Sequence, residues 1–269
     1  MAVKTKAQPF LKWAGGKRQL LPEIRKRIPA RFHTYFEPFV GAGAVFFDIQ
    51  PKKAVINDIN FELINTYRMI QNDVEKLIAE LEKYKNEKEF YYKIRNLDRT
   101  QEFEKLSNVE RAARLIYLNK TCFNGLFRVN RRGQFNVPFG KYKHPNIVNA
   151  DVLRAVHEYL ITNEISILNV DFGQAVEQAE AGDFIYFDPP YDPLSETANF
   201  TDYSLHGFTR DDQIRLRDLF VKLDKRGCYV LLSNSATPFI KELYADFHVE
   251  IVEANRTINS DAAKRGKIA

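Results

Sequence analysis

Six short runs of apolar residues along the chain predict β-strands, because bulky and β-branched side chains are concentrated in them. The runs are TYFEPFV (34–40), KAVIND (53–58), ISILNV (165–170), DFIYFD (183–188), CYVLLSN (228–234) and FHVEIVE (247–253). Helical periodicity separates the later runs, as in DDQIRLRDLFVKL at residues 211–223. Alternating strands and helices predict a mostly parallel sheet covered on both faces.

The stretch between the second and third predicted strands has a different character. From Phe61 to about Asn119 the apolar residues follow a helical period, and the stretch contains neither Gly nor Pro. We therefore expect several consecutive helices there. The whole pattern predicts an α/β domain made of residues 1–58 and 145–269, interrupted by a helical insertion of residues 59–144.

The insertion ends in the sequence NGLFRVNRRGQFNVPFG, residues 124–140. Asn-Gly at 124–125 and Arg-Gly at 132–133 bracket LFRVN, and QFNV follows. Glycine-containing pairs around short runs of β-forming residues predict a β-hairpin, here spanning residues 124–137.

Composition narrows the class of protein. The 269 residues are 45% hydrophobic and 28% charged, which is enough apolar material for a sizeable core. No apolar run approaches the roughly 20 residues needed to span a bilayer, and the opening MAVKTKAQPF lacks a signal-peptide core. We expect a soluble, cytoplasmic protein. Cys122 and Cys228 predict buried thiols, and the five histidines lack metal-ligand spacing, so no metal site is expected.

The net charge of +5 is concentrated in one part of the chain. Between Arg111 and Ala150 there is no Asp or Glu, while eight basic residues occur: Arg111, Arg114, Lys120, Arg128, Arg131, Arg132, Lys141 and Lys143. A one-sided excess of this kind indicates a polyanion-binding surface, most simply one for nucleic acid. A two-stranded ribbon fits the major groove, where arginine can bind guanine, so we interpret the hairpin as a base-reading element.

Two polar motifs follow the first two predicted strands. Gly41-Ala42-Gly43 lets the backbone approach a nucleoside closely, and Asp58 at the end of the second strand suits a ribose diol. Phe46 stands where the dinucleotide fingerprint has its third glycine, which argues against a pyrophosphate cofactor. A nucleoside without a pyrophosphate is the consistent ligand, and S-adenosylmethionine meets that description.

The fourth predicted strand stops abruptly at Asp188-Pro189-Pro190-Tyr191. Paired prolines cannot donate to a sheet ladder, so the chain leaves the sheet at Asp188 and places a carboxylate at the carboxyl end of a strand. Ligands bind at this edge of open α/β sheets. Taken alone, the motif is equally compatible with ordinary Asp-Pro turn chemistry.

The motifs and their order resemble the Dam-type N6-adenine DNA methyltransferases that act on GATC, and are most similar to the Dpn-type restriction-modification methylases. The resemblance covers essentially the full length and rests on PFLKWAGGKRQLLP, FEPFVGAGAVFFD, INDIN, NGLFRVN with GQFNVPFGKYK, VDFG and YFDPPY. It implies a Rossmann-like S-adenosylmethionine-dependent methyltransferase sheet with an inserted helical DNA-recognition domain that carries the β-hairpin. It also implies double-stranded DNA as the partner, and a restriction endonuclease that shares the site without necessarily being bound.

For the chemistry, the resemblance implies that adenine is flipped out of the duplex and methylated at N6 by direct in-line transfer. Asp188 and the Pro189 carbonyl would accept hydrogen bonds from the amine, Pro190 would help to fix the backbone, and Tyr191 would stack on the base. The cofactor would be held by Trp13 and Lys17 near its methionine end, Gly41 and Gly43 under the nucleoside, Asp58 on the ribose, Asp171 and Phe172 around the adenine, with Glu37, Phe39 and Asp188 completing the site.

The residues expected to contact DNA are Lys12, Phe123, Asn124, Leu126, Arg128, Arg131, Arg132, Pro138, Lys141 and Lys143. Among them, Phe123 and Asn124 would fill the gap left by the flipped base, and Arg128 would read a guanine. The three cations Arg131, Arg132 and Lys143 would contact phosphates.

Three other activities are compatible with parts of the pattern: N4-cytosine DNA methylation, protein-glutamine methylation, and DNA binding without catalysis. Two expectations concern the chain's architecture. Residues 192–208 form a polar, glycine-ended stretch that we interpret as a loop ordering over the flipped base. The sequence ends in KRGKIA, where the family that it resembles continues into a final sheet strand, and the residues alone leave open whether the chain is cut before that strand.

Overall fold

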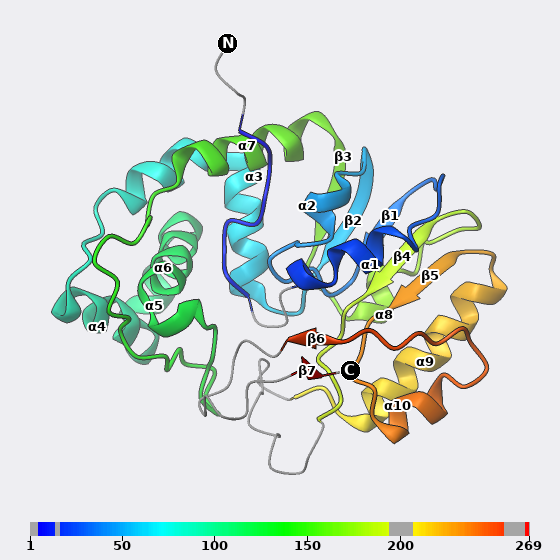
Figure 1. The fold of residues 1–269 in the computed structure, drawn as a ribbon. Helices are drawn as coiled ribbons and strands as arrows, with labels where there is room; N and C mark the ends of the chain where they lie inside the picture. The colour runs from blue at the N-terminus through cyan, green and yellow to red at the C-terminus, as the bar shows by residue number, and fades with distance from the viewer. Residues whose placement is uncertain (1–4, 14–16, 194–206, 256–266, 269) are drawn as a thin grey trace.

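A parallel five-stranded sheet forms the centre of the computed structural model, which describes residues 5–13, 17–193, 207–255 and 267–268 (Figure 1). The strand order is β3-β2-β1-β4-β5, with bounds β1 (Tyr35–Glu37), β2 (Lys53–Asn57), β3 (Glu164–Leu168), β4 (Phe184–Phe187) and β5 (Tyr229–Leu232). The order reverses between the adjacent strands β1 and β4. This reversal is the place where open α/β sheets bind ligands.

The two central strands are buried throughout, as parallel sheets covered on both faces require. Successive side chains point to opposite faces and join two separate cores. Tyr35 and Tyr186 belong to one core, and Phe36 and Phe187 to the other. The prediction of an α/β fold with a covered parallel sheet is therefore confirmed.

Helices cover each face of this sheet. One face packs against α2 (Phe46–Ile49), α7 (Ala150–Thr162) and the start of α3 (Phe61–Leu81), and the other against α8 (Phe172–Ala175), α9 (Arg210–Lys225) and α10 (Pro238–Leu243). At the N-terminal side the chain forms η1 (Lys17–Gln19) and α1 (Leu21–Arg25). The start of α9 is fixed by a capping box in which Thr209 and Asp212 bond reciprocally.

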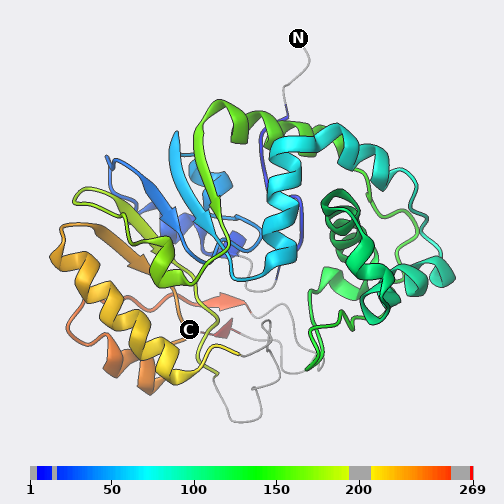
Figure 2. The same ribbon diagram turned by 180° about the vertical axis from the view of Figure 1, so that it is seen from behind.

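Consecutive helices follow β2, as predicted. After α3 come α4 (Lys88–Asn96), η2 (Leu97–Arg99), α5 (Glu102–Lys105) and α6 (Asn108–Thr121), and we call residues 88–121 the helical lobe. The long helix α3 packs on α6 and also on α7 and β3, so it joins the lobe to the sheet (Figure 2). In its first half the Tyr67 hydroxyl donates to the Gly41 carbonyl, and Arg68 donates to the Ile167 carbonyl.

The predicted hairpin of residues 124–137 forms only in part. Asn124 and Gly125 have φ values of 57° and 64°, but they close η3 (Phe123–Gly125) after α6 instead of opening a strand. Beyond them the two arms meet at one isolated antiparallel bridge, Val129 with Phe135. The hairpin therefore extends only over residues 128–136, where the Asn130 and Asn136 amides donate to the Gln134 and Arg128 carbonyls. The Arg-Gly turn at 132–133 lies at its tip, where Gly133 donates to the Asn130 carbonyl.

The return arm bonds to the helical lobe along its outer edge, which explains how it holds its shape without a longer ladder. The Phe135 amide donates to Asp98 at 2.8 Å, and Arg99 donates to the Phe135 carbonyl at 2.8 Å. The Tyr91 hydroxyl donates to the Val137 carbonyl at 2.8 Å. Side chains of the lobe thus satisfy the backbone amide and carbonyl groups of this arm, which a third strand would otherwise do.

The strand predicted at residues 247–253 is wrong. Residues 248–253 have no regular structure, and a two-residue strand β6 (Ala254–Asn255) pairs antiparallel with β7 (Lys267–Ile268). Val249 and Ile251 are exposed, so the apolar alternation here covers no buried face among the described residues. The greater part of the predicted loop over the base, residues 194–206, and most of the KRGKIA ending lie outside the described residues.

Candidate active site at the carboxyl edge of the sheet

Acidic side chains stand at the carboxyl ends of three neighbouring strands. Glu37 is the last residue of β1, Asp58 follows β2, and Asp188 follows β4. Because the strands are parallel, these ends meet at one edge of the sheet, on both sides of the order reversal. The structure therefore brings together the acids that the sequence nominated separately.

Asp188 is paired with a buried lysine. The Lys17 ammonium lies 2.6 Å from Asp188 Oδ1 and 4.5 Å from the centre of the Tyr191 ring, and Lys17 is only 4% exposed. Burial raises the pKa of Asp188, while the Lys17 charge opposes that rise. Burial is the largest influence on the pKa of Lys17 and lowers it, but the charges and hydrogen bonds of Asp188 and Tyr191 together outweigh it, so the pKa is raised overall. The ammonium is thus the charge that favours an ionised Asp188.

Glu37 lies behind this pair. The Tyr35 hydroxyl donates to Glu37 Oε2 at 2.7 Å, and both residues are buried. Burial raises the pKa of Glu37 well above its ordinary value, and the nearby Asp188 charge adds to the rise. The site therefore favours a neutral Glu37 beside a charged Asp188, as expected for two carboxyl groups in one low-dielectric environment.

The turn after β1 brings backbone close to the site and has no room for side chains. Gly41 and Gly43 have φ values of 49° and 71°, which favour glycine. A Cβ atom on Gly41 would lie 2.9 Å from the Trp13 ring. The Tyr67 hydroxyl holds the Gly41 carbonyl at 3.1 Å, and Asp58 accepts from the Gly41 amide at 3.1 Å.

Asp58 is built as a hydrogen-bond acceptor. Besides the Gly41 amide, it accepts from the Asn60 amide at 2.9 Å. Burial raises the pKa of Asp58 to about 6, against the lowering effect of these two amides. Each carboxylate oxygen retains lone pairs for a further donor, which is what a ribose diol offers.

An aromatic wall stands on the other side of the β1 turn. The rings of Phe39 and Phe172 are 5.4 Å apart, and Phe208 lies within 6 Å of both. Asp171, in contrast, has structural partners: it caps α8 by accepting from the Gly173 amide, and it binds Arg215 through both oxygens at 2.8 and 2.9 Å. Burial raises the pKa of Asp171, but its hydrogen bonds with Arg215 and the Gly173 amide and the Arg215 charge together outweigh it, so the net shift is downward.

The N-terminal segment connects this site to the basic part of the chain. The Trp13 ring stacks on Phe127 with centroids 4.7 Å apart. Asn119 bonds to both the amide and the carbonyl of Lys12, at 2.9 and 2.7 Å, and the Lys12 ammonium lies 5.3 Å from the Tyr142 ring. Trp13, which is predicted to bind the cofactor, therefore packs on Phe127, which lies in the stretch that carries the predicted DNA contacts.

Most of the expected DNA contacts are at the surface. Leu126 is half-buried, and the exposed members are Lys12, Phe123, Asn124, Arg128, Arg131, Arg132, Pro138, Lys141 and Lys143. Phe123 is 53% exposed, which is unusual for so large an apolar side chain. Arg128 donates to Asn136 Oδ1 at 2.7 Å, so an amide orients its guanidinium. We call residues 123–143 the basic segment.

Sequence reasoning missed one organising residue of the site, Asn57. It is 1% exposed, and its side-chain amide donates to the Pro38 and Val170 carbonyls, both at 3.0 Å. Its Oδ1 accepts from the Val170 amide at 2.9 Å. Asn57 thus ties together the loops after β1, β2 and β3, and its position one residue before Asp58 at a strand end could have revealed it.

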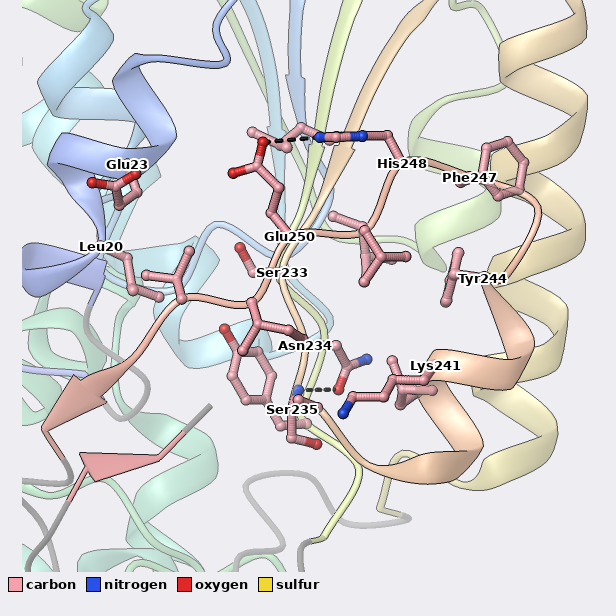
Figure 3. Close-up of a pocket in the computed structure, with 18 of the residues that line it drawn as sticks. Leu20, Glu23, Ser233, Asn234, Ser235, Lys241, Tyr244, Phe247, His248 and Glu250 are labelled. Atoms are coloured by element: carbon pink, nitrogen blue, oxygen red, sulfur yellow. Dashed lines mark hydrogen bonds and ion pairs between the residues drawn. The ribbon is translucent and has the colours of Figure 1, made fainter.

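An apolar cavity of about 480 Å³ lies beside the site, between β5, α10 and residues 247–252 (Figure 3). Tyr191 and Asp192 contribute to its wall, together with Ser233, Asn234 and Ser235. Within the part of the chain that the structure describes, no cluster of three or more His, Cys, Asp or Glu side chains could hold a metal ion. Nor does any described helix have the length and apolarity to cross a membrane.

Several known proteins are similar in sequence to this chain over nearly all of its length. The sequence model of the family described as D12 class N6 adenine-specific DNA methyltransferase matches residues 13–258. A Type II methyltransferase from Lactococcus lactis, M1.LlaDCHI, is 51% identical, covering 98% of this chain and 94% of the relative. The Type II methyltransferase M.MjaIII from Methanocaldococcus jannaschii is 44% identical, covering 96% and 95%. A DNA adenine methylase from Vibrio cholerae is 38% identical, covering 98% and 94%.

Proposed function

Because the chain belongs to the D12 class of N6 adenine-specific DNA methyltransferases, we propose that it methylates the adenine of GATC in duplex DNA, with residues 188–191 as the catalytic motif. The observation that carries the assignment of the site is the half-buried Asp188 carboxylate at the sheet's order reversal, which is paired with a buried Lys17 ammonium that also lies over the Tyr191 ring. Relatives named DNA adenine methylase support GATC as the target.

The class uses S-adenosylmethionine, and the described residues fit it. When bound, this cofactor supplies an electrophilic methyl group. The Gly41 turn packs so closely on Trp13 that a Cβ atom would collide with the ring, and Asp58 presents acceptors suited to the ribose. We assign the remaining contacts to Gly43, Glu37 and Lys17 near the turn and to Phe39 and Phe172 in the aromatic wall. Asp171 would act mainly by holding α8 beneath that wall, because Arg215 engages both its oxygens.

The protein's task is to prepare a poor nucleophile. The adenine amine has its lone pair delocalised into the ring. The Asp188 carboxylate and the Pro189 carbonyl, each accepting one N–H, would relocalise that lone pair and aim it at the methyl group. Tyr191 would stack on the base, and the fixed φ values of Pro189 and Pro190 hold the carbonyl in place. No covalent intermediate with the protein is required.

The amine lies within the base stack of a duplex, so the target base must be extruded into the site. We assign the extrusion to the basic segment, where Phe123 and Asn124 are exposed and would fill the vacated space. The segment is braced by the helical lobe through Asp98 and Tyr91, which supports residues 59–144 as the DNA-recognition region. The Type II names of two relatives support a restriction endonuclease sharing the same site.

Methyl transfer from radiolabelled S-adenosylmethionine tests this function. The substrates are a duplex with one GATC, the same duplex already N6-methylated on both strands, and a duplex with the site scrambled. We expect label only in the unmodified GATC duplex. Label in the scrambled duplex would refute the GATC assignment and leave the chemistry standing, whereas DNA binding without any label would refute the catalytic assignment.

The basic segment yields a prediction that separates affinity from specificity. Replacing Arg131 and Arg132 with alanine should lower the slope of log K against log salt by about 2, with little change in the preference for GATC. Arg128→Ala should instead reduce that preference by about tenfold or more. Fluorescence anisotropy on GATC and scrambled duplexes at several salt concentrations measures both quantities.

The exposed Lys222 on α9, on the opposite side of the molecule, provides the matched control (Figures 1 and 2). Lys222→Ala should change neither the salt slope nor the preference. Equal effects of all these substitutions would show that the basic segment acts only through the overall charge of the protein.

A further inference from the structure

Three polar side chains, from α9 and from the residues after β5, bond to the backbone on either side of Tyr191. Gln213 of α9 is 1% exposed, and its side-chain amide donates to the Pro190 carbonyl at 2.9 Å. The Gln213 carbonyl oxygen accepts in turn from the Asn234 side-chain amide at 3.0 Å. The two side-chain amides therefore link α9 and the residues after β5 to the loop that carries Tyr191.

Asn234 and Ser235 also bond to the same loop at Asp192, the residue after Tyr191. Asn234 Oδ1 accepts from the Asp192 amide at 3.1 Å and from the Ser235 amide at 2.8 Å, the second of which is drawn in Figure 3. The Ser235 hydroxyl donates to the Asp192 carbonyl at 2.5 Å. We call Gln213, Asn234 and Ser235 the amide clamp, since they bond to the backbone immediately before and after Tyr191.

The two amides of the clamp bond to each other and to an irregular loop. Burying amides is costly unless their hydrogen bonds are satisfied, and here the donor and acceptor groups of both amides are engaged. Their partners are one another and an irregular loop, with no helix or sheet ladder among them. Prolines cannot donate, so Pro189 and Pro190 cannot tie the loop to the sheet through their own nitrogens. The clamp supplies the contacts that the motif itself is unable to make.

We propose that Gln213, Asn234 and Ser235 are positioning residues for methyl transfer, which set the direction of the Pro189 carbonyl and the plane of the Tyr191 ring against the target adenine. This inference rests on the proposed role of residues 188–191. The clamp does not touch the substrate; it acts through the loop it holds. A small rotation of the Pro190 peptide would turn the preceding carbonyl away from the amine, and misplacement of about 1 Å can cost about 100-fold in rate.

Gln213→Glu is the sharpest test because it keeps the shape of the side chain. It replaces the donor to the Pro190 carbonyl with a carboxylate oxygen, so an attraction becomes a repulsion. We expect kcat for methyl transfer to fall about 10- to 100-fold, while the Kd values for duplex and cofactor stay within about threefold. Asn234→Asp, which removes the donor to Gln213, should behave alike.

Ser235 offers a graded pair and a second route should Gln213→Glu fail to fold. Ser235→Ala removes the bond to the Asp192 carbonyl and should lower kcat, whereas Ser235→Thr keeps the hydroxyl and should restore it. Asp183→Ala is the matched control. Asp183 is 4% exposed and accepts from the Thr34 amide at 2.8 Å, so its loss also deletes a buried hydrogen bond, but one at the amino end of β4, away from the loop. It should lower the melting temperature and leave kcat unchanged.

The outcomes separate this inference from the function on which it rests. Wild-type protein that binds DNA and transfers no methyl group would overturn both. Active wild type, inactive Asp188→Ala and folded clamp variants with full kcat would overturn the inference alone. So would clamp variants whose loss lies in duplex or cofactor affinity, or an Asp183→Ala variant that loses kcat as much as they do.

Discussion

Replacing Asp188 with alanine is expected to reduce the rate of methyl transfer about 10³-fold while duplex binding is retained. The carboxylate is one of two acceptors proposed to relocalise the lone pair of the adenine amine, and water cannot replace it in a buried, oriented position. Removing it also leaves the buried Lys17 ammonium without its 2.6 Å partner, next to the amine that must attack. Both effects act on the chemical step, so single-turnover rates with radiolabelled cofactor are the appropriate measurement.

The same strand supplies a matched control for this prediction. Asp183, one residue before β4, is also buried and accepts from the Thr34 and Glu180 amides, both at 2.8 Å. It lies at the amino end of the strand, and Asp188 lies at the carboxyl end. Asp183→Ala should lower stability and leave the rate per folded molecule unchanged. If Asp188→Ala retained more than about a tenth of the wild-type rate, the carboxylate would not be the acceptor that the reaction needs.

The strands of the central sheet were predictable because each is a local, nearly continuous apolar run that can be buried on both faces. Residues 247–253 show the limit of that reasoning. Their alternation is as regular as that of a strand, yet a strand also needs a partner along its edge, and pairing is a long-range property. The basic segment shows the reverse case. Its turn at 132–133 was predicted correctly, but the arm that follows the turn is held by Asp98 and Tyr91, which lie outside the segment.

The site residues also divide into those that a local motif predicts and those that depend on long-range packing. Paired prolines mark the end of β4, and Gly41 with Gly43 marks the close turn, so Asp188 and the turn could be nominated from short motifs. The amide clamp could not be predicted in this way. Gln213 belongs to a helix rich in charged residues, so the sequence alone suggests a surface position, and its bond to the loop appears only once α9 is packed there. The Lys17–Asp188 contact is likewise invisible in the sequence, where the two residues belong to separate motifs.

Lys17 therefore supports a second prediction. It distinguishes whether Lys17 sets the charge of Asp188 or, as the sequence suggested, binds the methionine end of the cofactor. Burial raises the pKa of Asp188, and among the described residues Lys17 is the group that lowers it. Lys17→Met removes that influence, so the pKa of Asp188 should rise further. Transfer requires the ionised form and is lost as pH falls through this pKa. The acidic limb of the rate profile should thus move to higher pH in the variant.

At neutral pH we expect Lys17→Met to lower the single-turnover rate about 10- to 100-fold, with partial recovery as the pH is raised. Lys17→Arg keeps a positive charge and should leave the limb near its wild-type position. Glu37 and Tyr191 face the same pair, and Lys17 lowers the pKa of each, so Lys17→Met also raises their pKa values. Lys17→Arg keeps the charge and therefore serves as the control for these accompanying shifts.

The alternative role gives a different pattern. If Lys17 acted only on the methionine end of S-adenosylmethionine, Lys17→Met would raise the KM for the cofactor at every pH and leave the limb unshifted. A shifted limb with a small change in KM would instead show that the buried ammonium sets the charge of Asp188. Its position 4.5 Å from the Tyr191 ring, on the proposed path of the target base, favours the second outcome.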